Sequence, residues 1–116
     1  MIYLDYAASS PPFSQAIDEM SAVALARFGN PGALHKCGTD ARGILQKSRL
    51  LLAQLTNVRP EEIFFTSGGT EADNWAILGT VKRYGKRGKH IITTQIEHHA
   101  ILHTAQALEK EGFTVE

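Results

Sequence analysis

The 116-residue chain has a single cysteine, Cys37, and no long apolar run. One cysteine cannot form a disulfide within the chain, which agrees with a reducing compartment. No window approaches the roughly 18 uninterrupted apolar residues of a membrane-spanning helix. The N-terminus, MIYLDYAASS, lacks the basic start and apolar core of a secretion signal. We therefore expect a cytoplasmic protein with no membrane partner.

The chain also lacks an excess of either charge, because 12 lysines and arginines balance 12 aspartates and glutamates. A balanced chain has no global field that would draw it to nucleic acid or to an anionic membrane surface. Hydrophobic residues make up 43% of the chain, which is enough to build a core. The length fits one domain, so we expect a single folded core. From the charge balance we expect no nucleic-acid partner.

Apolar spacing predicts helices separated by short strands. A helix is expected from Phe13 to just before Gly29, and a second, more strongly amphipathic helix should pack on a core. The core-facing residues of that second helix are Ile44, Leu45, Leu51, Leu52 and Leu55. Residues 63–66 (IFFT) and 90–94 (HIITT) are apolar without alternation, as in strands that are covered on both faces.

The same alternation continues to the last residue. Residues 71–84 predict a crossover helix closed by Gly85, and residues 100–111 predict another that stops at a left-handed Gly112. Phe113 and Val115 then begin a third strand. Strands that alternate with helices predict an α/β fold with a partial doubly wound parallel sheet, preceded by N-terminal helical segments. Because that sheet has an open edge, we expect the α/β domain over 13–116, which follows an N-terminal segment over 1–12, to be incomplete.

The stretch FTSGGTEADNWAI, residues 65–77, places glycines and hydroxyls between a strand and a helix. The first N–H groups of a helix lack intrahelical partners and attract anions. Gly68 and Gly69 allow close approach of a ligand, and Thr70 and Ser67 offer hydroxyl donors. The stretch matches neither nucleotide-loop pattern, so it favours a different phosphate-bearing cofactor. The alternative is a capped turn, in which Ser67 or Thr70 serves only as the N-cap.

The stretch TTQIEHHAIL, residues 93–102, is a second junction of strand and helix. The carboxyl ends of parallel strands share one edge of a sheet, so a histidine here would face the anion site across a flat ligand. Two alternatives stay open: His98 caps the helix, and one of the adjacent His98 and His99 points away. His99 and His103 have the spacing of a metal pair, but no third ligand is evident, so we expect no metal.

Two other features have plainer explanations than a site. Cys37 would suit a sulfur acceptor, but a small buried or half-buried thiol is the expected role. The run VKRYGKRGKH, residues 81–90, holds five basic residues in eight, which would attract RNA. A solvated helix end that the helix dipole favours is expected instead.

Four stretches together resemble the N-terminal part of the cysteine desulfurases, the pyridoxal-phosphate enzymes of the class V aminotransferase family. In order and spacing they are YLDYAASSPP, FGNPGALHKCG, FTSGGTEADNWAI and GKHIITTQIEHHAIL, and the likeness spans nearly all of the chain. The resemblance implies that Gly69 and Thr70 bind the phosphate of pyridoxal 5'-phosphate. It also implies that His98 stacks on the cofactor ring and acts catalytically in proton transfer.

The resemblance further implies a substrate mouth near a subunit interface, lined by Ala8, Asn30 and His35. The complete protein would be a homodimer that converts L-cysteine to L-alanine and an enzyme-bound persulfide. Its sulfur would pass to an acceptor or to an iron–sulfur scaffold protein. Residues near the mouth depart from the family's usual choices at Ser9–Ser10 and at Gly32, which leaves the substrate preference open.

The resemblance also implies what residues 1–116 do not contain. The family's cofactor-tethering lysine, its aspartate and arginine partners and its sulfur-accepting cysteine match no position here, so we expect the chain alone to be inactive. One alternative is a selenocysteine lyase or another class V pyridoxal-phosphate enzyme. The other is a non-catalytic, shorter homologue that acts as a binding or assembly partner.

Overall fold

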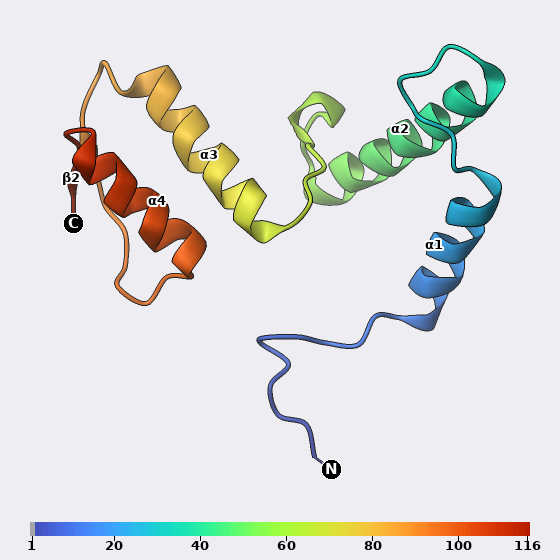
Figure 1. The fold of residues 1–116 in the computed structure, drawn as a ribbon, viewed down its shortest axis with the longest axis horizontal. Coiled ribbons are helices and arrows are strands. Elements are labelled where there is room, and N and C mark those ends of the chain that lie inside the picture. Colours follow the sequence, from blue (N-terminus) through green and yellow to red (C-terminus); the bar gives the residue numbers. More distant parts are fainter. Residues whose placement is uncertain (1) are drawn as a thin grey trace. The chain divides into compact units, whose positions relative to one another are not determined.

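The computed structural model describes residues 2–116 and consists of helices with one small sheet (Figure 1). The elements in chain order are α1 (Ser14–Ala26), α2 (Lys36–Thr56), the 3₁₀ helix η1 (Pro60–Glu62), α3 (Gly69–Tyr84), β1 (His90–Ile91), α4 (His99–Lys110) and β2 (Thr114–Val115). They form two compact units, Met1–Phe64 and Phe65–Glu116. The expectation of one core is therefore wrong, because each unit buries its own residues. The expected division at residue 12 stays a prediction.

The four predicted helices all form, and the three whose ends were predicted lie close to them. Phe13 is the N-cap residue of α1, and Gly85 directly follows α3. Gly112 has a φ of 86°, so the predicted left-handed residue after α4 is confirmed. The N–H groups of Gly112 and Phe113 donate to the carbonyl oxygens of Glu109 and Leu108, which satisfies acceptors at the end of α4.

The predicted parallel sheet is confirmed for two strands. β1 pairs with β2 in parallel, with His90 opposite Thr114 and Ile91 opposite Val115. Hydrogen bonds continue past both strands: Thr114 N–H donates to the Lys89 carbonyl at 2.7 Å, and Thr93 N–H donates to the Glu116 carbonyl at 2.6 Å. The fold is therefore a partial α/β arrangement in which α4 connects parallel strands.

Residues 63–66 were expected as a buried strand, and this prediction is wrong. In the described structure they lie outside the sheet, which joins only β1 and β2. Phe64 and Phe65 are 65% and 43% exposed, and Ile92 beside β1 is 79% exposed. A short apolar run indicates side chains that suit a β-sheet. A strand also needs an adjacent strand whose backbone completes its hydrogen bonds, and the run itself does not provide one.

In the first unit, the buried residues are small ones on α2. Gly38, Ala41 and Ala53 are buried, while Leu51 and Leu55 of the predicted core face are 52% and 79% exposed. The expected core face of α2 is therefore wrong. Helical spacing identifies an apolar stripe, but it does not determine which part of the helix another element covers.

The second unit is built on α4, which lies beside α3 and β2 (Figure 1). Its buried residues are Ala100, Thr104, Ala105 and Leu108. Leu108 is only 1% exposed, and complete burial of a leucine side chain contributes about 1.5–3 kcal/mol. This packing holds the start of α4 beside α3, which positions the candidate site.

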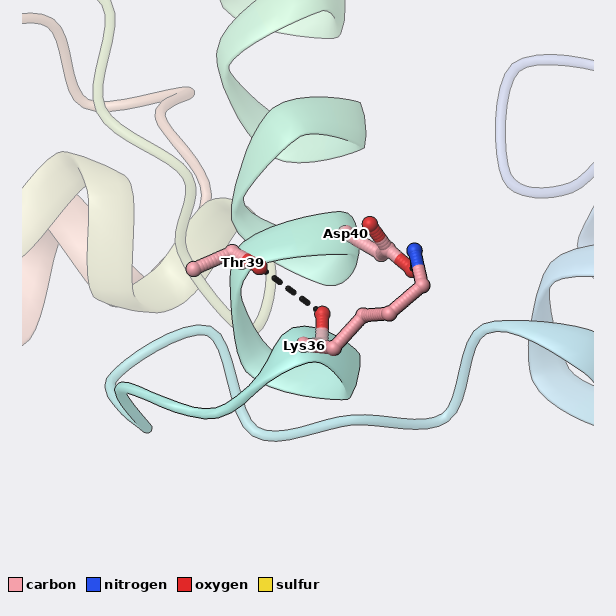
Figure 2. Close-up of polar contacts among 3 residues, drawn as sticks. All are labelled: Lys36, Thr39 and Asp40. Atoms are coloured by element: carbon pink, nitrogen blue, oxygen red, sulfur yellow. Dashed lines mark hydrogen bonds and ion pairs between the residues drawn. The ribbon is translucent and has the colours of Figure 1, made fainter.

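The start of α2 and the loop before it are held by side chains of the helix. Figure 2 shows the Thr39 hydroxyl donating to the Lys36 carbonyl at 2.8 Å, with the Lys36 ammonium turned toward Asp40 at 3.2 Å. This exposed ion pair contributes little, about 0.3–0.5 kcal/mol. Arg42 reaches back instead, and its guanidinium donates to the carbonyls of Pro31 at 2.7 Å and Ala33 at 2.9 Å.

Candidate functional site

A groove of about 400 Å³ lies between α3 and α4. Thr70 from the start of α3 and His98 from the residue before α4 both line it. The other lining residues are Asn74, Leu78, His99, Ala100, His103, Thr104 and Ala107. Two residues that the sequence singled out at separate junctions thus share one groove. Gly69 precedes Thr70 as the first residue of α3 and does not itself line the groove.

The N-terminus of α3 has no capping side chain. Its N-cap is Gly68, so the alternative in which Ser67 or Thr70 caps the helix is wrong. The first helical bond is from Ala72 N–H to the Gly68 carbonyl, which leaves the earlier N–H groups of the first turn without an intrahelical acceptor. Within residues 2–116 the Thr70 hydroxyl also makes no hydrogen bond. Helix ends with unengaged donors of this kind suit an anion, and anion binding here stays a prediction.

Ser67, expected as a second hydroxyl donor to an anion, is already engaged. Its N–H and its hydroxyl donate to one carboxylate oxygen of Glu71, at 2.6 and 2.7 Å. The backbone hydrogen bond, followed by the hydroxyl hydrogen bond, lowers the pKa of Glu71. The resulting carboxylate lies in the first turn of α3, where the helix dipole favours a negative charge.

His98 caps α4 and also lines the groove. Its Nδ1 atom accepts the N–H of Ala100 at 3.1 Å, so the capping alternative is confirmed. An Nδ1 that accepts a hydrogen bond places the proton of the neutral ring on Nε2. The residue is exposed, and its Nε2 atom is not engaged by the cap.

His99 and His103 line the same groove as His98. The ring centroids of His98 and His99 are 6.2 Å apart, and those of His99 and His103 are 5.4 Å apart and stacked. The expectation that one of the adjacent histidines points away is therefore wrong. His98 has an extended backbone (φ −61°, ψ 148°) outside the helix, so helical spacing does not separate the two side chains. Among residues 2–116, no three metal-ligating side chains lie close enough to hold a metal ion.

Asn74 and Thr104 are site residues that sequence reasoning missed. Asn74 Nδ2 donates to the Thr70 carbonyl at 2.8 Å. The Thr104 hydroxyl lies 2.7 Å from Asn74 Oδ1 and 2.8 Å from the Ala100 carbonyl. This chain of hydrogen bonds joins the first turn of α3 to the first turn of α4. Its local parts have i, i+4 spacing, but no sequence signal pairs Asn74 with Thr104.

The three predicted mouth residues belong to the first unit and do not line this groove. Ala8 is in a turn closed by its N–H and the Asp5 carbonyl at 3.1 Å. Asn30 Oδ1 accepts the Gly32 N–H at 2.8 Å, and the carbonyl of His35 accepts hydrogen bonds from the first turn of α2. All three are exposed, and their role at a mouth stays a prediction.

The remaining sequence features have simple structural outcomes. Cys37 is exposed in the first turn of α2, so the expected buried or half-buried thiol is wrong. Lys82 and Arg83 lie in the last turn of α3, as expected for a basic helix end. No helix in the described part of the chain has both the length and the apolar character needed to cross a bilayer.

Comparison with known proteins identifies close relatives. Cysteine desulfurase IscS of Clostridium botulinum (strain Hall) is 47% identical over 114 residues, which cover 98% of this chain and 29% of the relative. The solved structure of a NifS-like protein has a TM-score of 0.91 at 36% identity, over 99% of this chain and 32% of that one. SspA, solved in complex with cysteine, has a TM-score of 0.88 at 35% identity, over 98% and 33%.

The chain therefore spans about a third or less of the length of these relatives. Its likeness to them nevertheless extends over both units, because the matched region covers nearly every residue. The model of the family described as aminotransferase class-V matches residues 2–116. The chain belongs to the class V aminotransferase family.

Proposed function

We propose that the complete protein is a cysteine desulfurase that depends on pyridoxal 5'-phosphate, and that residues 1–116 provide the seat for the cofactor phosphate. The main support for this proposal is that Thr70, at the uncapped start of α3, and His98 line the same groove. The name of the C. botulinum relative and the cysteine in the SspA structure support L-cysteine as the substrate. The products in this proposal are L-alanine and an enzyme-bound persulfide.

The residues at the start of α3 fit a phosphate group. Gly69 and Thr70 would hold it through backbone N–H groups, and the Thr70 hydroxyl would add a third donor. A Cβ atom built on Gly68 or Gly69 would meet nothing within 4 Å, so there is room for the group. The bound cofactor supplies an electron sink for chemistry at the substrate's carbons.

His98 supplies a ring face and one proton site in this proposal. Because Nδ1 accepts the Ala100 N–H, His98 would hold or move a proton only at Nε2. The apolar parts of the groove, from Leu78 and Ala107, would limit water around that nitrogen. His98 would thus act both as a stacking partner of the cofactor ring and as a catalytic residue.

We assign the rest of the chain to a larger enzyme of this type. Residues 13–116 are proposed as part of the doubly wound cofactor domain of a fold type I transferase, and residues 1–12 as a segment of the active-site mouth. Ala8, Asn30 and His35 would line that mouth in a homodimer. The enzyme would act in the cytoplasm and pass sulfur to an acceptor or to an iron–sulfur scaffold protein. Residues 1–116 alone would not turn over L-cysteine.

Turnover by the protein isolated from its own cells tests this proposal. Alanine and sulfide are measured with L-cysteine as substrate, a thiol reductant and added pyridoxal 5'-phosphate. Equal yields of alanine and sulfide are expected. Much faster alanine release from selenocysteine would assign the lyase alternative. No turnover of either amino acid would contradict an enzymatic role and leave the binding-partner alternative.

Replacement of Thr70 tests the phosphate seat separately. Thr70→Ala should weaken binding of pyridoxal 5'-phosphate by about tenfold, because a hydrogen bond to a charged group contributes about 1.5–3 kcal/mol. Thr80→Ala is the matched control, since Thr80 is exposed on the same helix and does not line the groove. Cofactor fluorescence during titration gives both affinities. Equal affinities of the two variants would exclude Thr70 from the seat.

A further inference from the structure

Five of the 12 basic residues of the chain are concentrated in one short segment. We define the basic turn as these five residues, Lys82, Arg83, Lys86, Arg87 and Lys89. No acidic residue occurs between Asp73 and Glu97. All five side chains of the basic turn are exposed. The neutral overall charge therefore hides a strongly positive local surface.

The basic turn has no carboxylate partner within residues 2–116. The ion pairs there join Lys36 to Asp40, Arg59 to Glu62 and His90 to Glu116, and none includes a residue of the basic turn. None of the five side chains donates a hydrogen bond to a carbonyl either, unlike Arg42. Cations this close together repel one another, and an anion that binds among them would offset that repulsion.

The helix dipole explains only part of the basic turn. Lys82 and Arg83 lie in the last turn of α3, where positive charge stabilises the helix. Lys86, Arg87 and Lys89 follow the end of α3 at Tyr84, and the effect of the dipole falls off within one turn. Three unpaired cations therefore remain without a role in the stability of α3.

Two of these three cations are held in place by aromatic rings. The guanidinium carbon of Arg87 lies 5.4 Å from the centroid of the Tyr84 ring, and Lys89 Nζ lies 5.5 Å from that of Phe113. The backbone is anchored as well, since Arg87 N–H donates to the Tyr84 carbonyl and the Lys89 carbonyl accepts the Thr114 N–H, both at 2.7 Å. Cations held in this way lose less side-chain entropy when a partner binds.

We propose that the basic turn is a docking surface for a carboxylate-rich segment of a partner protein. Arg87 and Lys89 lie over one face each of the Tyr84 and Phe113 rings, so those faces are not available for stacking by nucleic-acid bases. The chain also carries no net positive charge that would attract a long polyanion such as nucleic acid over its whole surface. A short acidic segment matches the size and the charge of this surface. The proposal does not depend on the proposed desulfurase activity.

Fluorescence anisotropy with a labelled octaglutamate peptide tests the proposal on the full chain at about 50 mM salt. Lys82→Glu combined with Lys86→Glu should weaken binding about tenfold, because two attractions become repulsions. These lysines do not rest on the rings, so the change leaves the contacts of Tyr84 and Phe113 in place. The matched control is Arg27→Glu with Lys47→Glu, two exposed cations that form no ion pair and carry the same charge change.

Each outcome bears directly on the proposal. Tenfold weakening in the first variant and less than about twofold in the control would support a localised surface. Equal losses in both variants would overturn it, because net charge alone would then control binding. Tighter binding of an octauridylate of similar charge would overturn it in favour of nucleic acid. No measurable binding of the peptide to the natural chain would also reject the docking surface. Circular dichroism confirms that the variants are folded, and Lys82→Gln with Lys86→Gln repeats the test without charge reversal.

Discussion

At His98, the imidazole Nδ1 atom accepts the Ala100 N–H while the ring lines the groove between α3 and α4. His98→Ala should lose both the helix cap, at a cost of about 1 kcal/mol in the free energy of unfolding, and the ring that would contact the cofactor. His98→Asn should keep the cap, because asparagine is a good N-cap residue, but lose the ring. Urea unfolding and titration with pyridoxal 5'-phosphate measure the two effects separately.

The two variants of His98 thus separate structure from chemistry. We expect His98→Asn to unfold like the natural chain and to bind the cofactor as weakly as His98→Ala. His90→Ala is the control, since His90 pairs with Glu116 across the sheet and does not line the groove. Cofactor affinity that survives in His98→Asn would show that the cap, and not the ring, is what His98 contributes.

Glu71 should make the free energy of unfolding decrease as the pH falls. Its pKa is lowered in the folded chain by the Ser67 N–H and the Ser67 hydroxyl, so its carboxylate stabilises the fold above the ordinary pKa of an unfolded glutamate. That contribution is lost as the pH falls through the lower folded-state pKa. Because Glu71 is exposed, the effect is small. Urea unfolding between pH 3 and pH 7, about the range over which carboxylates titrate, measures it.

Glu71→Gln should flatten the part of that pH dependence which Glu71 supplies. Glu109→Gln is the matched control, since its exposed carboxylate accepts no hydrogen bond within the described residues. The same pH dependence in the natural chain and in Glu71→Gln would contradict a stabilising contact between Glu71 and Ser67.

At the scale of one helix, two glycines of α2 have opposite surroundings. A Cβ on Gly38 would collide with the carbonyl oxygens of Ala33 and Asn30, whereas one on Gly43 would meet nothing within 4 Å. Gly38→Ala should therefore destabilise the chain by about 1–3 kcal/mol. Gly43→Ala should stabilise it by about 0.5–1 kcal/mol, because alanine is the better helix former. Urea midpoints measure both, and equal shifts would contradict the packing of the Asn30 loop on α2.

The elements differ in how well the sequence predicted them. The helix ends at Gly85 and Gly112 were found because each depends on residues a few positions away. Residues 63–66 were misassigned because a strand also needs a partner that the run itself does not specify. The sequence placed the glycines and Thr70 at the start of α3, but it did not predict the engagement of Ser67 by Glu71.

At the scale of the molecule, the second unit depends on Leu108. Among residues 2–116 this side chain is the largest that is fully buried, at 1% exposure, and it belongs to α4, which contacts α3 and β2. Leu108→Ala should cost about 2–5 kcal/mol, through lost transfer energy and the cavity that it leaves. Hydrogen exchange should then show lost protection in α3, α4 and the two strands.

A conservative change at the same position provides the control. Leu108→Met keeps the volume of the side chain and should cost less than about 1.5 kcal/mol. Amides of α2 in the first unit serve as the internal reference for the exchange rates. Unchanged protection of α3 and α4 in Leu108→Ala would mean that this side chain does not hold the second unit together.

Local chemistry in the sequence was enough to place the helices, the left-handed Gly112 and the two junctions that carry Thr70 and His98. Helical hydrogen bonds, caps and turns connect residues only a few positions apart, so their signals lie within a short stretch. Tertiary packing alone decided that residues 63–66 stay outside the sheet and that Asn74 meets Thr104 across 30 positions. Such contacts depend on which surfaces come together, and no single stretch of sequence contains that information.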